Sequence, residues 1–229
     1  MMGLNLSDGP GHVPLRKTNV FLAASIPNPS RWPGYFDARE ITDAVVAGAR
    51  AVLTAGGTLV TGAHPTISPL LLYVAAELPK DVDGPRVVVY QSALFGNSMP
   101  AETRRFETEG VGRLCITDAA PGDRPEYPHW HESLRIMRER MFSETHPRAG
   151  IFIGGMQDIS VECDLLRALR PEPVIYALAR PGGEAAKLME YTPPSLQRTL
   201  TEDDVYPSVF RKVVSDLARR EDADQPGSP

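Results

Sequence analysis

The chain has 229 residues, of which 42% are hydrophobic and 23% are charged, a composition typical of a globular protein with a sizeable core. Its formal net charge of −5 argues against nonspecific DNA or RNA binding, which needs a basic surface to displace counterions. The two cysteines are too few for a disulfide framework or a Cys-rich zinc site, and no apolar run is long enough for a membrane helix.

The two ends of the chain differ from its middle. Residues 1–18 are rich in glycine, proline and polar residues and lack the apolar segment of a signal peptide. Residues 219–229 are charged and then rich in Pro, Gly and Ser. We therefore expect a cytoplasmic protein with flexible tails over 1–18 and 219–229. No linker-like stretch divides the rest, which predicts a single domain over 19–218.

Between the tails, short apolar runs alternate with longer amphipathic ones. The first amphipathic run places Ile41, Val45, Ala49 and Val52 on one face of a helix, which the glycines at 56–57 end. In chain order, the predicted elements are strand 19–25, helix 37–55, strand 58–61, helix 69–78, strand 86–90, strand 112–117, helix 127–145, strand 150–154, helix 161–169, strand 173–178, short helix 184–191 and helix 203–220.

The alternation of strands and helices predicts the fold class. The strand at 86–90 is continuous and β-branched, as expected for a strand that is buried on both faces. We predict an α/β, Rossmann-like, doubly wound and mainly parallel sheet of six or seven strands, with helices on both faces. Ligands of such sheets bind beyond the carboxyl ends of the strands, where the strand order reverses, so the loops that follow the strands are the candidate site.

The loop at 62–69 joins the second predicted strand to a helix. Gly62 can adopt a positive φ at a sharp exit from the strand, and Thr66 or Ser68 can cap the helix. The helix N-terminus would then offer free N–H groups and a dipole to an anion, and His64 could bond a ribose or a phosphate. A well-capped connection that binds no ligand explains this loop equally well.

Three other strands also end in unusual loops. Ser25 and Ile26 begin a proline-rich exit, which could present the Ser25 hydroxyl to a ligand or could be only a rigid turn. Gly154 and Gly155 follow the fifth strand, and paired glycines let a backbone approach a ligand and form an anion nest. The glycine pair at 182–183, Gly182 and Gly183, follows the sixth strand in the same way.

Two charged residues join these loops as candidates. Glu162 falls near the start of the helix after Gly155, where a carboxylate favours the helix dipole whether or not it contacts a ligand. Arg138, on the long helix before the fifth strand, could clamp a phosphate bidentately, although a solvated helix face is the more common environment for such an arginine. His129 and His131 lack the spacing and companions of a metal site, so no metal is expected.

Several nucleotide and catalytic motifs are absent from the sequence. There is no Walker-type Gly-Lys-Thr/Ser loop and no Gly-x-Gly-x-x-Gly, so ATP hydrolysis and ordinary nicotinamide redox chemistry lose support. The Gly-x-Ser-x-Gly elbow of α/β-hydrolases is also missing.

Three short runs stand out: Ala-Ser-Ile-Pro at 24–27, Leu-Val-Thr-Gly-Ala-His-Pro-Thr-Ile-Ser-Pro at 59–69 and Ile-Gly-Gly-Met at 153–156. Together they resemble the SLOG superfamily over residues 19–192. The chain looks closest to prokaryotic SLOG domains joined to, or encoded beside, TIR and other NAD-linked defence effectors. It has Ala63 where the family usually has glycine, and Asp158 where a third glycine often falls.

The resemblance implies a cytoplasmic sensor that binds a nucleotide or an NAD-derived, ADP-ribose-like signal, cyclic forms included. The positions that match the family's ligand-binding motifs are Ser25, Ile26, Gly62, His64, Ser68, Gly154, Gly155, Met156, Glu162 and, with more variable spacing, Arg138. No separate cofactor is expected. From the same resemblance we expect a homo-oligomer, with output through self-association or an effector such as a TIR chain. The net charge and the lack of a long apolar run predict no nucleic-acid or membrane partner.

The same superfamily contains enzymes similar to the LOG phosphoribohydrolases, which cleave a base from a nucleoside monophosphate. Their motif is Pro-Gly-Gly-x-Gly-Thr-x-x-Glu, and this chain has one extra residue before Glu162. An extra residue turns a helical side chain by about 100°, and glycoside hydrolysis depends on an accurately placed carboxylate. We therefore favour binding over catalysis and keep a nucleotide N-glycosidase that uses Glu162 as the alternative.

Overall fold

The structure, a computed structural model, describes Leu15 and residues 18–78, 86–97, 99, 101–126 and 128–224. Its centre is a six-stranded sheet in which every pair of neighbours is parallel, in the order β4-β3-β2-β1-β5-β6. The strands are β1 (Asn19–Ser25), β2 (Thr58–Gly62), β3 (Val87–Ser92), β4 (Gly112–Thr117), β5 (Ala149–Gly154) and β6 (Val174–Leu178). The predicted α/β, Rossmann-like fold is confirmed.

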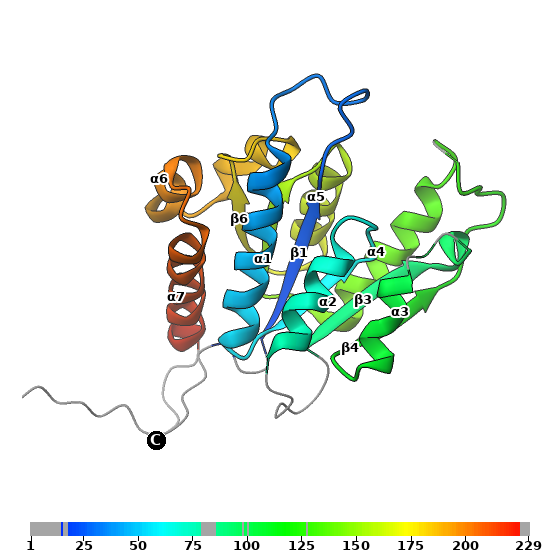
Figure 1. Ribbon diagram of the computed structural model, residues 1–229, viewed down its shortest axis with the longest axis horizontal. Helices are drawn as coiled ribbons and strands as arrows, with labels where there is room; N and C mark the ends of the chain where they lie inside the picture. The colour runs from blue at the N-terminus through cyan, green and yellow to red at the C-terminus, as the bar shows by residue number, and fades with distance from the viewer. Residues whose placement is uncertain are drawn as a thin grey trace, which may run out of the picture.

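Helices cover both faces of the sheet, and Figure 1 looks onto the face that carries α1, α2 and α7. The α-helices are α1 (Ala38–Thr54), α2 (Ser68–Glu77), α3 (Ala101–Thr108), α4 (His131–Thr145), α5 (Asp158–Leu169), α6 (Pro194–Glu202) and α7 (Tyr206–Asp224), and the 3₁₀ turns are η1 (Ala93–Phe95) and η2 (Glu184–Tyr191). The sequence analysis missed η1, α3 and α6, in which few residues are buried.

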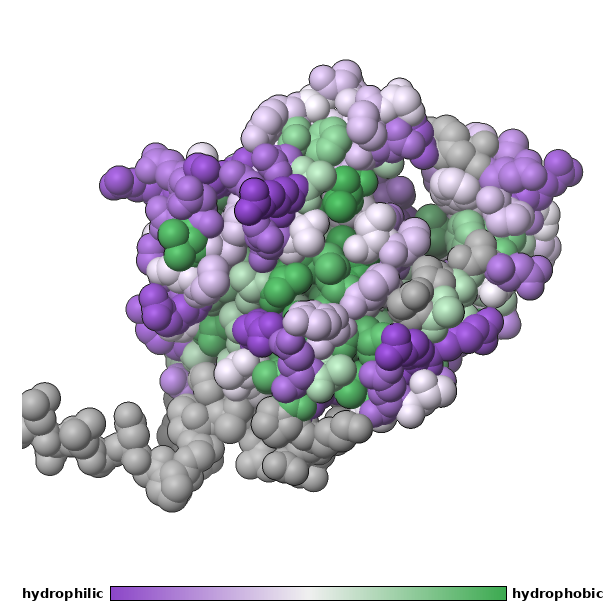
Figure 2. Space-filling view, in the orientation of Figure 1, coloured by the Kyte–Doolittle hydropathy of each residue, from purple (hydrophilic) through white to green (hydrophobic). Residues whose placement is uncertain are grey.

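Two apolar cores lie on opposite faces of the sheet because side chains alternate along each strand. On the α1 face, Leu22 and Ile151 pack with residues of α1, α2, α6 and α7. On the other face, Phe21 and Phe152 pack with residues of α4, α5 and η2. Figure 2 shows apolar residues across the middle of the α1 face, with hydrophilic residues over α6 and α7.

The α1 helix illustrates how local sequence sets these elements. Asp37 lies just before the helix and accepts hydrogen bonds from the N–H groups of Arg39 and Glu40, each over 2.9 Å, which satisfies two N–H groups that have no partner within the helix. The predicted face, which includes Ile41 and Val45, is fully buried against the sheet.

The strand order places the reversal between β1 and β5. From β1 the chain moves outward through β2, β3 and β4, and it then returns to the other side of β1 as β5. At this reversal Ser25 pairs with Gly154 at the carboxyl ends of the two strands. A long loop over 26–37 rises above this edge before α1 begins (Figure 1). The topology therefore leaves a crevice at the strand ends that carry the predicted site.

The predicted tails differ from the structure where it can be compared. Leu15 and Thr18 are both buried; the Leu15 N–H donates to the Ala55 carbonyl and the Thr18 hydroxyl donates to Glu221, so the prediction of a flexible tail fails at these two residues. The C-terminal helix was predicted to end at Arg220 but continues to Asp224. The remainder of both predicted tails, 1–14, 16–17 and 225–229, lies outside the described residues. Within the described chain, no helix combines the length and the apolar character needed to cross a membrane.

Candidate functional site

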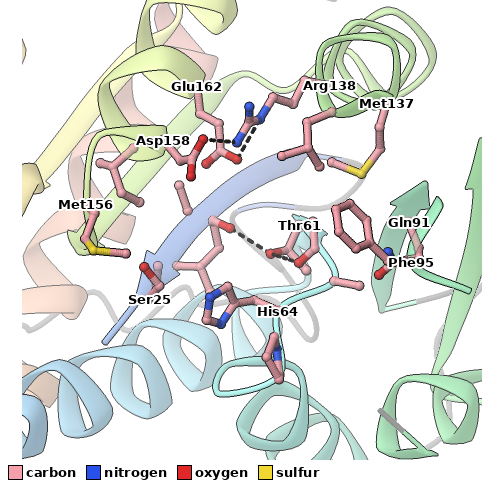
Figure 3. Close-up of a pocket in the computed structure, with 18 of the residues that line it drawn as sticks. Ser25, Thr61, His64, Gln91, Phe95, Met137, Arg138, Met156, Asp158 and Glu162 are labelled. Atoms are coloured by element: carbon pink, nitrogen blue, oxygen red, sulfur yellow. Dashed lines mark hydrogen bonds and ion pairs between the residues drawn. The ribbon is translucent and has the colours of Figure 1, made fainter. Parts of the chain in front are cut away.

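A cavity of about 460 Å³ lies at the carboxyl ends of β1, β2 and β3, between the starts of α4 and α5. Its size falls within the roughly 300–1,000 Å³ typical of small-molecule sites. Figure 3 shows side chains from these separate elements converging on it. The predicted residues that line it are Ser25, Gly62, His64, Arg138, Met156 and Glu162.

The loop after β2 uses most of its own N–H groups. The N–H of His64 donates to the Ser68 hydroxyl over 3.2 Å, and the N–H groups of Ile67 and Ser68 donate to the His64 carbonyl. The Ala63 N–H donates to the Tyr90 carbonyl of the neighbouring strand. The prediction that this loop would offer free amides to an anion is therefore wrong, because the turn closes on itself.

Two details of this loop also differ from the sequence prediction. Gly62 does not adopt a positive φ, because it remains part of the extended strand β2. No side chain caps α2, so neither Thr66 nor Ser68 acts as predicted. Ser68 is fully buried and outside the cavity lining. Its hydroxyl shapes the loop and does not face a ligand.

The hydrogen bonds of His64 define which nitrogen of its imidazole ring carries the proton. Its Nδ1 lies 2.9 Å from the Thr66 hydroxyl and 3.3 Å from the Thr66 backbone nitrogen. A backbone N–H can only donate, so Nδ1 must accept and the neutral ring carries its proton on Nε2. Burial lowers the pKa of His64 below its usual value, although the charge of Asp158 opposes the shift. At neutral pH the ring is therefore an uncharged Nε2–H donor at the cavity wall.

The start of α5 provides the free backbone donors that the α2 loop lacks. Gly154 and Gly155 both adopt positive φ, at 64° and 72°, which turns the chain sharply out of β5. No side chain caps α5, and in the described chain no hydrogen bond uses the N–H groups of Met156, Gln157 or Asp158. Because Met156 and Asp158 line the cavity, the positive end of this helix lies beside it.

Arg138, Asp158 and Glu162 form an ion-pair cluster on the cavity wall (Figure 3). The Arg138 guanidinium is buried and lies 3.0 Å from Glu162 Oε1 and 3.1 Å from Asp158 Oδ1. Burial lowers the pKa of Arg138, but the two carboxylates outweigh it, so the pKa lies above its usual value. Burial raises the pKa of Glu162, an effect that Arg138 only partly offsets. Arg138 is therefore neutralised by protein groups and does not lie on a solvated helix face; its contact with a phosphate stays a prediction.

Helix α5 begins at Asp158, three residues before the predicted start at 161, which moves Glu162 from the first turn into the second. The extra residue before Glu162 does not turn its side chain out of the site, since Glu162 lines the cavity.

The remaining predicted residues lie behind the cavity or away from it. Ile26 packs against the core of the α1 face. Gly182 and Gly183 also adopt positive φ, but a Cβ would meet the Tyr35 carbonyl oxygen at 2.4 Å for Gly182 and the Gly154 carbonyl carbon at 2.5 Å for Gly183. These two glycines let the 26–37 loop and the β5 exit pack closely, and they do not line the cavity.

Sequence reasoning missed the part of the cavity that follows β3. Gln91 lies at the end of β3, Phe95 in η1 and Trp130 just before α4, and all three line the cavity. The Phe95 and Trp130 rings meet edge to face, with centroids 5.7 Å apart. The position of Gln91 at the carboxyl end of a predicted strand was the available signal. The sequence held no signal that places Trp130 at the cavity, since it lies 35 residues after Phe95.

A second, more open cavity of about 1100 Å³ adjoins the first along α5 and the 26–37 loop. The residues that line both are Arg31, Trp130, Arg138, Met156 and Asp158. The Arg138–Asp158 ion pair therefore forms part of a wall that the two cavities share. In the part of the chain that the structure describes, no cluster of three or more His, Cys, Asp or Glu residues could hold a metal ion.

The fold and the position of the cavity define a Rossmann-like α/β protein with a crevice at its topological reversal. The model of the SLOG cluster3 family matches residues 34–214, and the chain belongs to this family. No curated protein matches the chain. The match confirms the SLOG resemblance that the loops after β1, β2 and β5 carried.

Proposed function

We propose that the cavity binds a nucleotide or an NAD-derived, ADP-ribose-like molecule, and that the protein acts as a sensor of it. The observation that supports this most strongly is the uncapped N-terminus of α5, with the free N–H groups of 156–158, beside a cavity at the strand reversal. Such a helix end is suited to hold a phosphate.

The charges of the cavity favour a ligand with both phosphate and sugar groups. Arg31 and Arg138 balance Asp158 and Glu162, and His64 is neutral, so the lining carries little net charge. A bare anion would gain little from such a site. A ribose can donate its hydroxyls to the carboxylates while its phosphate lies on α5, so both kinds of group find partners.

The role in signalling is proposed from the family. Membership of the SLOG cluster3 family, together with the resemblance to SLOG domains that accompany TIR and other NAD-linked effectors, favours a function in prokaryotic defence or stress signalling. Output would then pass through a homo-oligomer or a partner effector chain.

Titration calorimetry with AMP, ADP-ribose, cyclic ADP-ribose and NAD tests the proposal. Substitutions at Gly62 can leave the cavity open or fill it, depending on their size. A Cβ there would make only an ordinary 3.5 Å contact with Met137, so a small side chain is tolerated. We expect binding of at least one of these molecules, retention in Gly62→Ala and loss in Gly62→Leu, whose side chain enters the cavity. Absence of heat with every molecule would favour a nucleotide-like fold that serves only as an interaction scaffold. Undiminished binding in Gly62→Leu would show that the ligand binds outside this cavity, which also overturns the proposal.

The position of Glu162 supports a second candidate function, a nucleotide N-glycosidase. A carboxyl group at a cavity wall with a pKa raised by burial is suited to act as a general acid. Incubation with AMP, cytokinin-type monophosphates and NAD, followed by chromatography for free base, distinguishes the two. Release of base that disappears in Glu162→Gln supports the enzyme, and intact ligand after binding supports the sensor.

A further inference from the structure

The cavity has two chemically different ends. Ser25, Met156 and Asp158 lie on one side in Figure 3, and Gln91, Phe95 and Met137 lie together on the other. The first side carries the carboxylates and the α5 N-terminus. The second side is lined mostly by aromatic and aliphatic side chains from the β3 exit and the start of α4. A ligand that fills the cavity must therefore be polar at one end and largely apolar at the other.

The apolar end is suited to a flat ring. Phe95 and Trp130 are both half-buried at the cavity, and neither belongs to the two cores of the sheet. Their edge-to-face contact at 5.7 Å, with an interplanar angle of 65°, holds the two rings in place. Aromatic side chains at the wall of a nucleotide-sized cavity provide stacking surfaces for a base. Met99, Leu134 and Met137 add aliphatic surface around them.

Gln91 is a polar side chain at this end, and it is buried. Gln91 is only 5% exposed and lines the cavity. One N–H of its carboxamide donates to the Ser92 carbonyl over 3.2 Å. In the described part of the chain its Oε1 accepts no hydrogen bond and its second N–H donates none. Buried amides are normally paired, so this acceptor and donor, held side by side, are available to the edge of a ligand.

We propose that this end of the cavity holds an adenine base, stacked on Phe95 and Trp130, with Gln91 as the residue that reads its edge. This inference rests on the proposed binding of a nucleotide-derived ligand. Adenine offers an exocyclic N–H donor next to a ring-nitrogen acceptor, which matches the two free groups of a glutamine amide. The C2–H of adenine can lie against aliphatic side chains without the loss of a hydrogen bond.

Guanine fits the same end less well. Its edge can also meet an amide, but its 2-amino group then needs a further acceptor. The side chains that line the cavity together with Gln91 include Phe95, Met99, Leu134 and Met137, which accept no strong hydrogen bonds. A 2-amino group buried there without a partner weakens binding on the order of tenfold. The preference for adenine thus arises from the apolar surroundings of Gln91 as much as from the amide.

Calorimetry on the full chain with four probes, AMP, 2-amino-AMP, GMP and ribose 5-phosphate, tests the assignment. For the wild-type protein we expect AMP to bind about tenfold more tightly than 2-amino-AMP and GMP. This comparison needs no variant and so does not depend on how a substitution folds. Equal affinity for AMP and 2-amino-AMP would overturn the proposal.

Two variants assign the binding of the base to particular residues. In Gln91→Leu, which keeps the size of the side chain, we expect weaker AMP binding because the adenine edge loses its hydrogen-bond partner, whereas the preference over 2-amino-AMP, which depends on the apolar surroundings, remains. In Phe95→Leu we expect all three nucleotides to bind more weakly. Ribose 5-phosphate should bind both variants as it binds the wild type. An affinity for AMP that is unchanged in Gln91→Leu contradicts the role of Gln91.

The outcomes separate this inference from the proposed function. If AMP and GMP bind equally and Gly62→Leu abolishes both, the cavity binds nucleotides but does not read the base. If no nucleotide binds in a way that Gly62→Leu removes, the proposed function fails and the base assignment fails with it.

Discussion

The ion pair between Arg138 and Glu162 gives a sharp test of the electrostatics of the site. Arg138→Met keeps much of the side-chain volume and removes the charge, which leaves Glu162 buried without its partner. Breaking a buried pair destabilises a protein by about 3–5 kcal/mol. Asp158, the second partner of Arg138, has a side chain that is 56% exposed and is solvated without help, so the loss falls on Glu162. We expect about 3 kcal/mol at neutral pH, the lower end of this range.

The pH dependence of this loss follows from the pKa of Glu162. Burial already raises this pKa, and Arg138 is the main influence that lowers it. In Arg138→Met the pKa rises further above its value in the unfolded chain, so the folded state binds a proton where the unfolded state has lost it. The free energy of unfolding of the variant therefore falls as pH rises above the ordinary carboxyl pKa. Its deficit should be smallest near the ordinary carboxyl pKa and should grow as pH rises above it.

Urea unfolding followed by circular dichroism measures these free energies, with the slope against urea as a check on two-state behaviour. The double variant Arg138→Met with Glu162→Gln removes both charges. We expect it to be about 2 kcal/mol more stable than the sum of the two single effects predicts. Additive effects, or a deficit in Arg138→Met that does not change with pH, would refute the assignment of a buried and mutually dependent pair.

Three further predictions concern other parts of the fold. Gly155→Ala should lower the free energy of unfolding, measured by thermal melting, by more than about 3 kcal/mol, because its Cβ would meet a side-chain atom of α5 at 2.1 Å. The matched control is Gly122→Ala, where φ is +88° but nothing lies within 4 Å. This variant should lose only about 1 kcal/mol of stability. Tyr176→Phe removes the buried 2.9 Å hydrogen bond to Asp216 and should lower the free energy of unfolding by about 1–2 kcal/mol. An unchanged value would mean that the ion pairs of Asp216 with Arg219 and Arg220 suffice for this carboxylate. Because the pKa of His64 is lowered, the folded state binds fewer protons than the unfolded chain, so stability falls as pH drops below 6.5. His64→Gln should flatten this part of the pH profile of the free energy of unfolding in urea. An unaltered profile would contradict the lowered pKa.

Only some of the residues that carried the family resemblance face the cavity, Ser25, His64 and Met156 among them. The histidine loop after β2 is part of the SLOG resemblance, yet its N–H groups bond within the loop and to β3. Gly182 and Gly183 resemble a second anion nest in sequence, but they accommodate the close approach of Tyr35 and Gly154. A glycine pair shows that backbones come close, and only the structure shows whether the neighbour is a ligand or another loop.

The sequence by itself determined the fold class and the position of the site edge. The strand at Asn19–Ser25 was predicted with its observed bounds, and the helix at Asp158–Leu169 was recognised although its start was placed three residues late. These predictions succeed because apolar periodicity and glycine exits are local properties of the chain. Helix α6 was missed because only Leu196 and Leu200 are buried in it, too few for a periodic signal.

Only the tertiary structure decided which groups meet at the site. Arg138 and Glu162 lie 24 residues apart in sequence, and their ion pair exists because α4 and α5 pack side by side on one face of the sheet. Gln91, Phe95 and Trp130 line one cavity because the β3 exit and the start of α4 converge at the same edge. Strand order and helix packing set such distances, and neither is a property of any local stretch of sequence. For the same reason, the sequence could point to a nucleotide-type edge, while the free helix end and the buried amide became visible only in three dimensions.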